Sequence, residues 1–77
     1  MMSQTYSQRI LNILITQERK GKNAIFNRGI AKQRFPKVTD IHGTVMRTAR
    51  KMQKDSLLKR IGPGTFTLSA YGRKIAN

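Results

Sequence analysis

The chain has 77 residues, too few for two average domains, so a single domain over residues 1–77 is expected. It has no Cys, which excludes a disulfide-stapled scaffold and any thiolate metal site. It carries 16 Lys and Arg residues against three acidic ones, giving a formal net charge of +13. A compact domain with this much self-repulsion indicates a polyanionic partner, with nucleic acid the commonest, an anionic membrane surface next and an acidic protein third.

The titratable residues do not predict catalysis. One His and three scattered carboxylates cannot readily form a triad, a carboxylate pair or a metal site, so no enzyme activity, cofactor or metal is expected. His42 is interpreted as a polar residue in the first turn of a helix rather than as a general base. The longest apolar run, Ile13–Ile15, is far too short to span a bilayer. Residues 1–7 lack the pattern of a signal peptide, so an intracellular, cytoplasmic or nucleoid-associated protein is expected.

The first predicted helix is strongly apolar. Ser7 is expected to cap it, and it should run to about Glu18. Its apolar residues between Tyr6 and Ile15 cover a broad arc, which is typical of a helix packed against more than one neighbour. A basic turn over residues 19–23, with Gly21 as the stop signal, should end it.

A short second helix is predicted next. Residues 24–26 form an apolar run too brief to classify by period, and either a one-pair strand or a helix start fits it. Asn27 is a plausible cap for a helix through Arg34, with Ile30 and Ala31 as its apolar content. Pro36 should stop it, because the residue before a proline avoids the helical region.

The third predicted helix begins near Thr39 or Asp40 and runs to about Lys54. Its core stripe, at helical spacing, is Ile41, Val45, Ala49 and Met52. Successive residues lie about 100° apart on a helix, so one long polar and basic face should lie opposite the core stripe. This face consists of Gly43, Arg47, Arg50 and Lys54, and it is flanked by Met46 and Lys51. Gly43 is interpreted as part of an irregular first turn.

The period then changes to that of strands. Residues 57–61 and 65–68 should pair as a hairpin, with Pro63 and Gly64 at the centre of a type II turn. Ser69 can cap a last short helix to Ile75. A chain this short needs its aromatic residues in the core, which predicts burial of Phe26, Phe35, Phe66 and Tyr71.

This order of helix, short helix, long basic helix and hairpin resembles the winged helix-turn-helix family of DNA-binding domains over nearly the whole chain. The residues that carry the resemblance are Ile30-Ala31, the stripe Val45/Ala49/Met52, Leu57–Ile61 entering the wing and Gly64–Arg73 leaving it. The resemblance implies a small α+β winged helix, which is a three-helix bundle with a C-terminal two-stranded β-hairpin wing and a short final helix.

The same resemblance implies that the third helix enters the major groove and that the wing touches an adjacent groove or the backbone. Carried over residue by residue, the candidate nucleic-acid-binding positions are Thr44, Arg47, Thr48, Arg50, Lys51, Lys54, Lys59 and Arg60. Arg47 and Arg50 are the best candidates for reading base edges, since arginine can reach guanine O6 and N7.

The expected function is therefore non-enzymatic binding of double-stranded DNA, by a monomer or weak homodimer acting as a transcriptional regulator or small phage or plasmid accessory protein. Two alternatives stay open, an RNA-binding or ribosome-associated protein and a small module that binds an acidic protein. The arginine-bearing helix face favours DNA over RNA, because it fits a B-form major groove but not the deep, narrow groove of A-form RNA.

Overall fold

The structure, a computed structural model, describes residues 5–76; residues 1–4, part of the segment interpreted as lacking a signal peptide, lie outside this range. Helix α1 spans Tyr6–Arg19 and is capped by Thr5, not by Ser7 as predicted. The Thr5 side chain accepts from the Gln8 amide, and the Gln8 side chain accepts from the Thr5 amide at 3.2 Å each, a reciprocal capping box that Ser7 cannot form from within the helix.

The end of α1 is a tight turn centred on glycine. Gly21 has a positive φ of 73°, and the amides of Gly21 and Lys22 donate to Glu18 and Gln17 carbonyls, both at 3.0 Å. This pattern satisfies carbonyls that the helix end would leave unpaired. The prediction that glycine stops the helix is confirmed.

The ambiguous run 24–26 forms a one-pair strand, the first of the two structures that it allowed. The Phe26 amide and carbonyl exchange hydrogen bonds of 2.7 and 2.8 Å with Phe66, an isolated antiparallel bridge. Helix α2, Arg28–Arg34, follows immediately, and its predicted cap is confirmed because the Asn27 side chain accepts from the Ile30 amide at 2.9 Å. The bridge therefore ties the beginning of α2 to the hairpin.

Helix α3 spans Val45–Lys54 and begins later than the sequence predicted. The side chain of Asp40 accepts from the Gly43 amide at 2.9 Å, as a helix cap would, but residues 41–44 form a separate turn. The Met46 amide reaches back to the Ile41 carbonyl across that turn, so the regular ladder of helical hydrogen bonds starts only afterwards. Gly43 and His42 thus precede the helix instead of lying in it.

Strands β1, Leu58–Gly62, and β2, Thr65–Leu68, form the two-stranded antiparallel sheet. Leu58 pairs with Leu68 and Arg60 with Phe66, while an irregularity between Arg60 and Gly62 leaves Ile61 as the extra residue. β1 is thus shifted by one residue from the predicted 57–61, and β2 matches its prediction. Gly64 has the positive φ, 62°, expected for its place in the turn.

Helix α4, Ala70–Ala76, begins after Ser69, whose hydroxyl accepts from the Gly72 amide at 2.9 Å as predicted. Its buried position is Gly72, where an added Cβ would lie 2.0 Å from the Leu57 carbonyl oxygen. Because Gly72 is the residue that packs against Leu57, the neighbouring Tyr71 is turned outward and is 53 % exposed. The prediction that Tyr71 belongs to the core is wrong.

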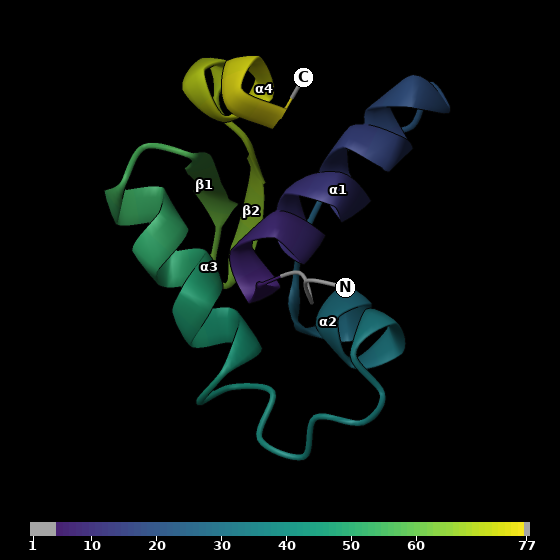
Figure 1. The fold of residues 1–77 in the computed structure, drawn as a ribbon, viewed down its shortest axis with the longest axis vertical. Coiled ribbons are helices and arrows are strands. Elements are labelled where there is room, and N and C mark those ends of the chain that lie inside the picture. The colour runs from purple at the N-terminus through teal and green to yellow at the C-terminus, as the bar shows by residue number, and fades with distance from the viewer. Residues whose placement is uncertain (1–4, 77) are drawn as a thin grey trace.

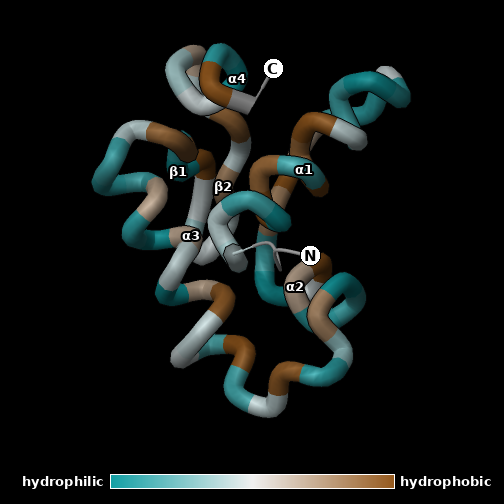
Figure 2. Tube along the Cα trace, viewed as in Figure 1, coloured by the Kyte–Doolittle hydropathy of each residue, from teal (hydrophilic) through white to brown (hydrophobic). Residues whose placement is uncertain are grey.

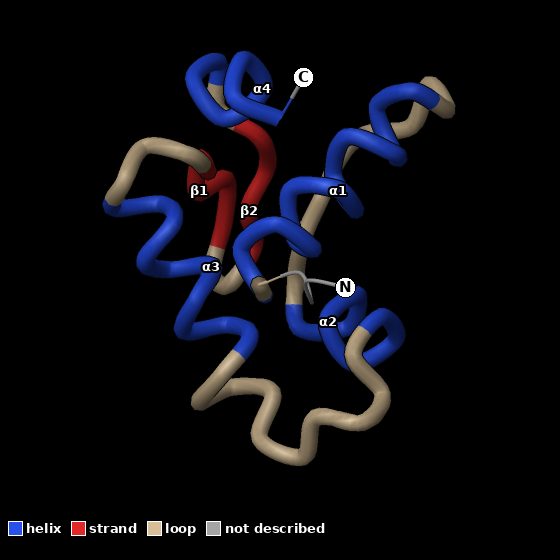
Figure 3. The backbone as a smooth tube through the Cα atoms, viewed as in Figure 1, coloured by secondary structure: helices blue, strands red, loops and turns tan. Residues whose placement is uncertain are grey.

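One hydrophobic core joins these elements into a small α+β domain of four helices and one hairpin, counted over residues 5–76 (Figure 1, Figure 3). The other predicted core residues are buried in it: Leu14, Phe26, Phe35, Ile41, Val45, Ala49, Met52 and Phe66. Along α3 the hydropathy alternates, as expected for a helix with one buried side (Figure 2). None of the described helices is long and apolar enough to cross a membrane.

Candidate nucleic-acid interface

Helix α3 divides into a buried side and a cationic side. Val45, Met46, Ala49 and Met52 are buried. Arg47, Arg50, Lys51 and Lys54 are all exposed, as the helical spacing predicts, and no acidic residue lies within the helix. Met46 lies beside the basic face as predicted, but it is only 5 % exposed and also belongs to the core, which the sequence did not predict.

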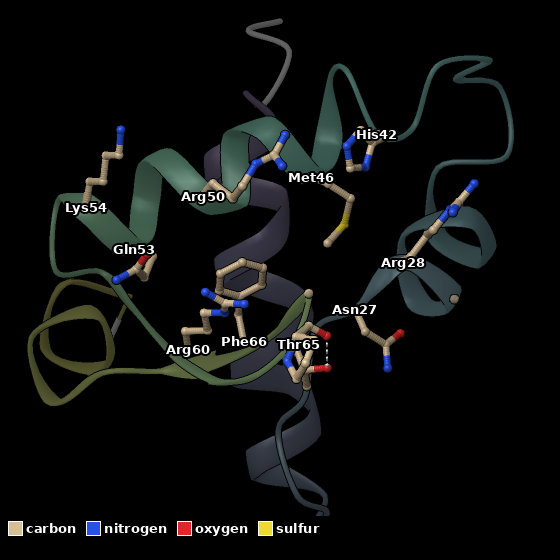
Figure 4. A pocket seen from close by; sticks show the side chains of 13 residues that line it. Asn27, Arg28, His42, Met46, Arg50, Gln53, Lys54, Arg60, Thr65 and Phe66 are labelled. Atoms are coloured by element: carbon tan, nitrogen blue, oxygen red, sulfur yellow. Dashed lines mark hydrogen bonds between the residues drawn. The ribbon is translucent and has the colours of Figure 1, made fainter.

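Two hollows flank the cationic side of α3. The larger is a groove of about 760 Å³ that separates α3 from the start of α2 and from the hairpin turn (Figure 4). The smaller, of about 470 Å³, is lined by Arg47, Thr48 and Lys51 together with Arg50 and Lys54. Arg50 and Lys54 line both, so they form the ridge between the two hollows.

The groove collects cations from three elements that are distant in sequence. Arg28 enters from α2, Arg50 and Lys54 from α3 and Arg60 from β1, on three sides in Figure 4. No acidic residue is among the described residues that line it. Its apolar lining includes the buried side chains of Met46 and Phe66, and His42, Asn27 and Gln53 are further polar neighbours. The groove is therefore suited to an anionic ligand with both charged and apolar surface, such as a sugar–phosphate strand.

The two predicted wing cations lie on opposite faces of the hairpin. Arg60 pairs with buried Phe66, and Lys59 pairs with Thr67, one residue along. Side chains alternate between the faces of a strand, so Lys59 points away from the groove that Arg60 lines. The Arg60 Nε donates to the Gly62 carbonyl at 3.2 Å, which holds its guanidinium beside the turn.

The two predicted threonines already use their hydroxyl protons. The Thr44 hydroxyl donates to the Asp40 carbonyl, and the Thr48 hydroxyl donates to the Thr44 carbonyl at 2.9 Å. Each oxygen keeps only its acceptor capacity for another partner. Because phosphate and carbonyl oxygens need donors, Thr44 and Thr48 are less suited to DNA contacts than the cations beside them.

Several groove residues were missed by sequence reasoning. Arg28 is not among the nucleic-acid-binding positions predicted above, and neither are His42, Asn27 and Gln53. Their shared place depends on the Phe26–Phe66 bridge, which joins segments 40 positions apart and has no local signal. Period-two alternation along β1 was the one available clue, because it separates Arg60 from Lys59.

An ion pair joins α1 to α4, remote in sequence from α3. The Arg73 guanidinium donates to both Glu18 oxygens, at 2.6 Å to Oε1 and 3.0 Å to Oε2. The hydrogen bonds from Arg73 lower the pKa of the Glu18 carboxyl; desolvation by burial opposes them, and the positive charge of Arg73 adds a lesser lowering effect. One of the three acids is thus engaged with a cation of its own.

Within residues 5–76, no group of three or more His, Cys, Asp or Glu side chains could hold a metal ion. Comparisons with protein-family models, curated proteins and solved structures find no match for this chain.

Proposed function

We propose that this chain is a winged helix-turn-helix protein that binds double-stranded DNA without catalysing a reaction. In this proposal α3 is the recognition helix in the major groove, and the hairpin is the wing on the adjacent backbone or groove. The order α1, α2, α3, β1, β2 supports this fold, and the protein would act as a small regulator or accessory protein.

The observation that carries the proposal is the collection of cations around one acid-free surface. Arg47 and Lys51 lie on one side of the ridge formed by Arg50 and Lys54, and Arg60 lies across the groove on the other side. Like charges three or four residues apart on a helix repel each other, so this arrangement disfavours the isolated fold. A polyanion that lies along α3 and enters the groove removes that repulsion.

The deciding experiment compares binding to duplex DNA, duplex RNA and single-stranded DNA over a range of salt concentrations. Roughly five to eight phosphate contacts should give a slope of about −5 to −7 in a plot of log affinity against log salt for duplex DNA. Duplex RNA of equal length should bind more weakly, because α3 cannot enter its narrow major groove. A slope shallower than about −2, or a preference for RNA, would contradict the proposal.

A further inference from the structure

The positive charge of the chain is not confined to the α3 surface. Six of the 16 Lys and Arg residues lie on α3 or line the groove, and the other ten lie elsewhere. A duplex bound to α3 neutralises only the cations within about a Debye length of its phosphates, roughly 8–10 Å at physiological salt. Most of the surplus charge then needs a different explanation.

The densest remaining cluster is a basic turn at the end of α1, which we define as Arg19, Lys20 and Lys22. All three side chains are exposed. Gly21 between them adopts a positive φ and has open space around it. Figure 2 shows this end of α1 as a hydrophilic extremity of the molecule.

The basic turn is held in one conformation. Besides the two backbone hydrogen bonds of the glycine turn, the Gln17 side chain accepts from the Ile25 amide at 2.9 Å and donates to the Ile25 carbonyl at 3.3 Å. These two hydrogen bonds join the residues on either side of the basic turn, Gln17 and Ile25. The entropy cost of ordering the backbone is therefore already met before any ligand arrives.

The one carboxylate next to the basic turn is already neutralised. Glu18 is bound by Arg73, so its charge does not repel an anion approaching the turn. Glu18 itself lines a shallow hollow of about 400 Å³, together with Lys22 and Asn23 and, from the hairpin, Ile61 and Thr67. The exposed Ile61 side chain therefore lies in the same hollow as Lys22.

The basic turn and α3 lie on opposite sides of the molecule. In Figure 1, α3 runs along the left edge, and α1 ends at the upper right, with the hairpin and the rest of α1 between them. The longest dimensions of the fold are 35 and 30 Å, and the view is down the shortest axis. A straight duplex lying on α3 therefore leaves the basic turn facing away from it.

We propose that the basic turn is a second phosphate-binding surface, and that one copy of the protein bridges two DNA duplexes. This inference rests on the proposed function for its first duplex and adds a second. An acidic protein is a poorer occupant, because specific protein interfaces have an apolar centre, and of the described residues that line the hollow beside this turn Ile61 is the one exposed large apolar side chain. A phosphate backbone requires only exposed cations held in place.

The test is a bridging assay with purified protein. One duplex is immobilised, a second labelled duplex of different sequence is added with the protein, and the retained label is measured. The test variant is Arg19→Gln/Lys20→Gln/Lys22→Gln. The matched control is Lys32→Gln/Arg34→Gln/Lys37→Gln, which removes the same charge from exposed positions on and after α2. Binding to a single free duplex and thermal melting are measured for every protein.

The test variant should lose bridging by about tenfold or more and reduce the salt slope of bridging by about three units, one for each lost phosphate contact. Its affinity for a single duplex and its melting temperature should stay close to those of the parent, and the control should bridge normally. Equal loss of bridging in both variants would overturn the inference in favour of general charge. If the parent protein binds a single duplex normally but does not bridge two duplexes, the inference is also overturned, whereas the proposed function is left intact.

One further variant separates bridging by one copy from bridging by two associated copies. Tyr71 and Ile75 are the exposed apolar residues of α4, at 53 % and 51 % exposure, and they could join two copies. Tyr71→Ser/Ile75→Ser should bridge as well as the parent. If this variant abolishes bridging, contact between copies and not the basic turn connects the duplexes.

Discussion

Helices α1 and α3 bury equal numbers of side chains and expose very different ones. α1 buries Ile10, Leu11, Leu14 and Ile15, and α3 buries Val45, Met46, Ala49 and Met52. The outer side of α1 mixes neutral and charged residues, whereas that of α3 is almost entirely cationic. Both helices already have the apolar contact that folding needs, so the charge on α3 serves no purpose in stability. This contrast separates residues that hold the fold from residues that are free to bind a partner.

The largest expected effect comes from the side chain on which both helices depend. Phe66 is 2 % exposed, pairs with Phe26 through the backbone, and belongs to the same core as the buried sides of α1 and α3. Phe66→Ala should lower the free energy of unfolding by ~3–5 kcal/mol, enough to unfold a domain this small. Thermal melts followed by circular dichroism measure this loss of stability. The milder control is Thr67→Ser, at the half-buried position next to Phe66. Melting like the parent would mean that the hairpin does not close the core.

On the cationic side of the comparison, substitutions should affect binding and leave folding unchanged. Arg47→Ala or Arg50→Ala should cost ~1–3 kcal/mol in affinity for the best-bound duplex and relax preference at particular bases. Both side chains are exposed, so the melting temperature should be that of the parent. Each variant is measured on one preferred and one scrambled duplex at matched salt, with Lys32→Ala as the control. Equal losses on both duplexes would remove α3 from the role of recognition helix.

The sequence predicted most of the fold wherever the signal was local. Asn27 and Ser69 are caps because their short polar side chains suit that position, and the buried stripe of α3 follows from helical spacing. The late start of α3 was missed because Asp40 makes the same hydrogen bond to a free amide in a turn as at a helix cap. Tyr71 was misplaced because the contact that excludes it, Gly72 against Leu57, joins residues 15 positions apart.

The candidate site was predicted less completely than the fold for the same reason. The exposed cations of α3 follow from its period, and the structure places them as expected. The groove depends on the meeting of α2, α3 and the hairpin, and no pattern within any one of them shows that Arg28 and Arg60 share it. Long-range contacts therefore decide the site, whereas local ones decide most of the helices and strands.

A smaller effect distinguishes two cations next to each other on β1. Arg60→Ala should reduce the salt slope of duplex binding by about one unit and weaken all sequences alike, because one phosphate contact in the groove is lost. Lys59→Ala should change the slope less, since Lys59 lies on the face away from the groove. Salt titrations of both variants on one duplex make the measurement. Equal changes would show that charge on the hairpin matters and the groove does not.

The smallest expected effect concerns the α1 side of the comparison and its ion pair. Arg73 lowers the pKa of Glu18 in the folded state, so the pair stabilises the fold at pH values above the unfolded pKa of a glutamate, ~4.3. This stabilisation is lost as the pH falls through the still lower pKa of the folded state. Both side chains are partly exposed, at 49 % and 27 %, so solvent screening keeps the effect small.

The difference in melting temperature between the parent and Glu18→Gln should therefore be greatest near neutral pH and shrink towards zero below about pH 4. Asp55→Asn is the matched control, since it removes one negative charge at an exposed position just after α3 without breaking an ion pair among the described residues. A difference that does not vary with pH would mean that the Arg73 pair contributes nothing to folding. Binding of a single duplex by Glu18→Gln at neutral pH should equal that of the parent, because in the proposed function that duplex lies on the cationic side of α3.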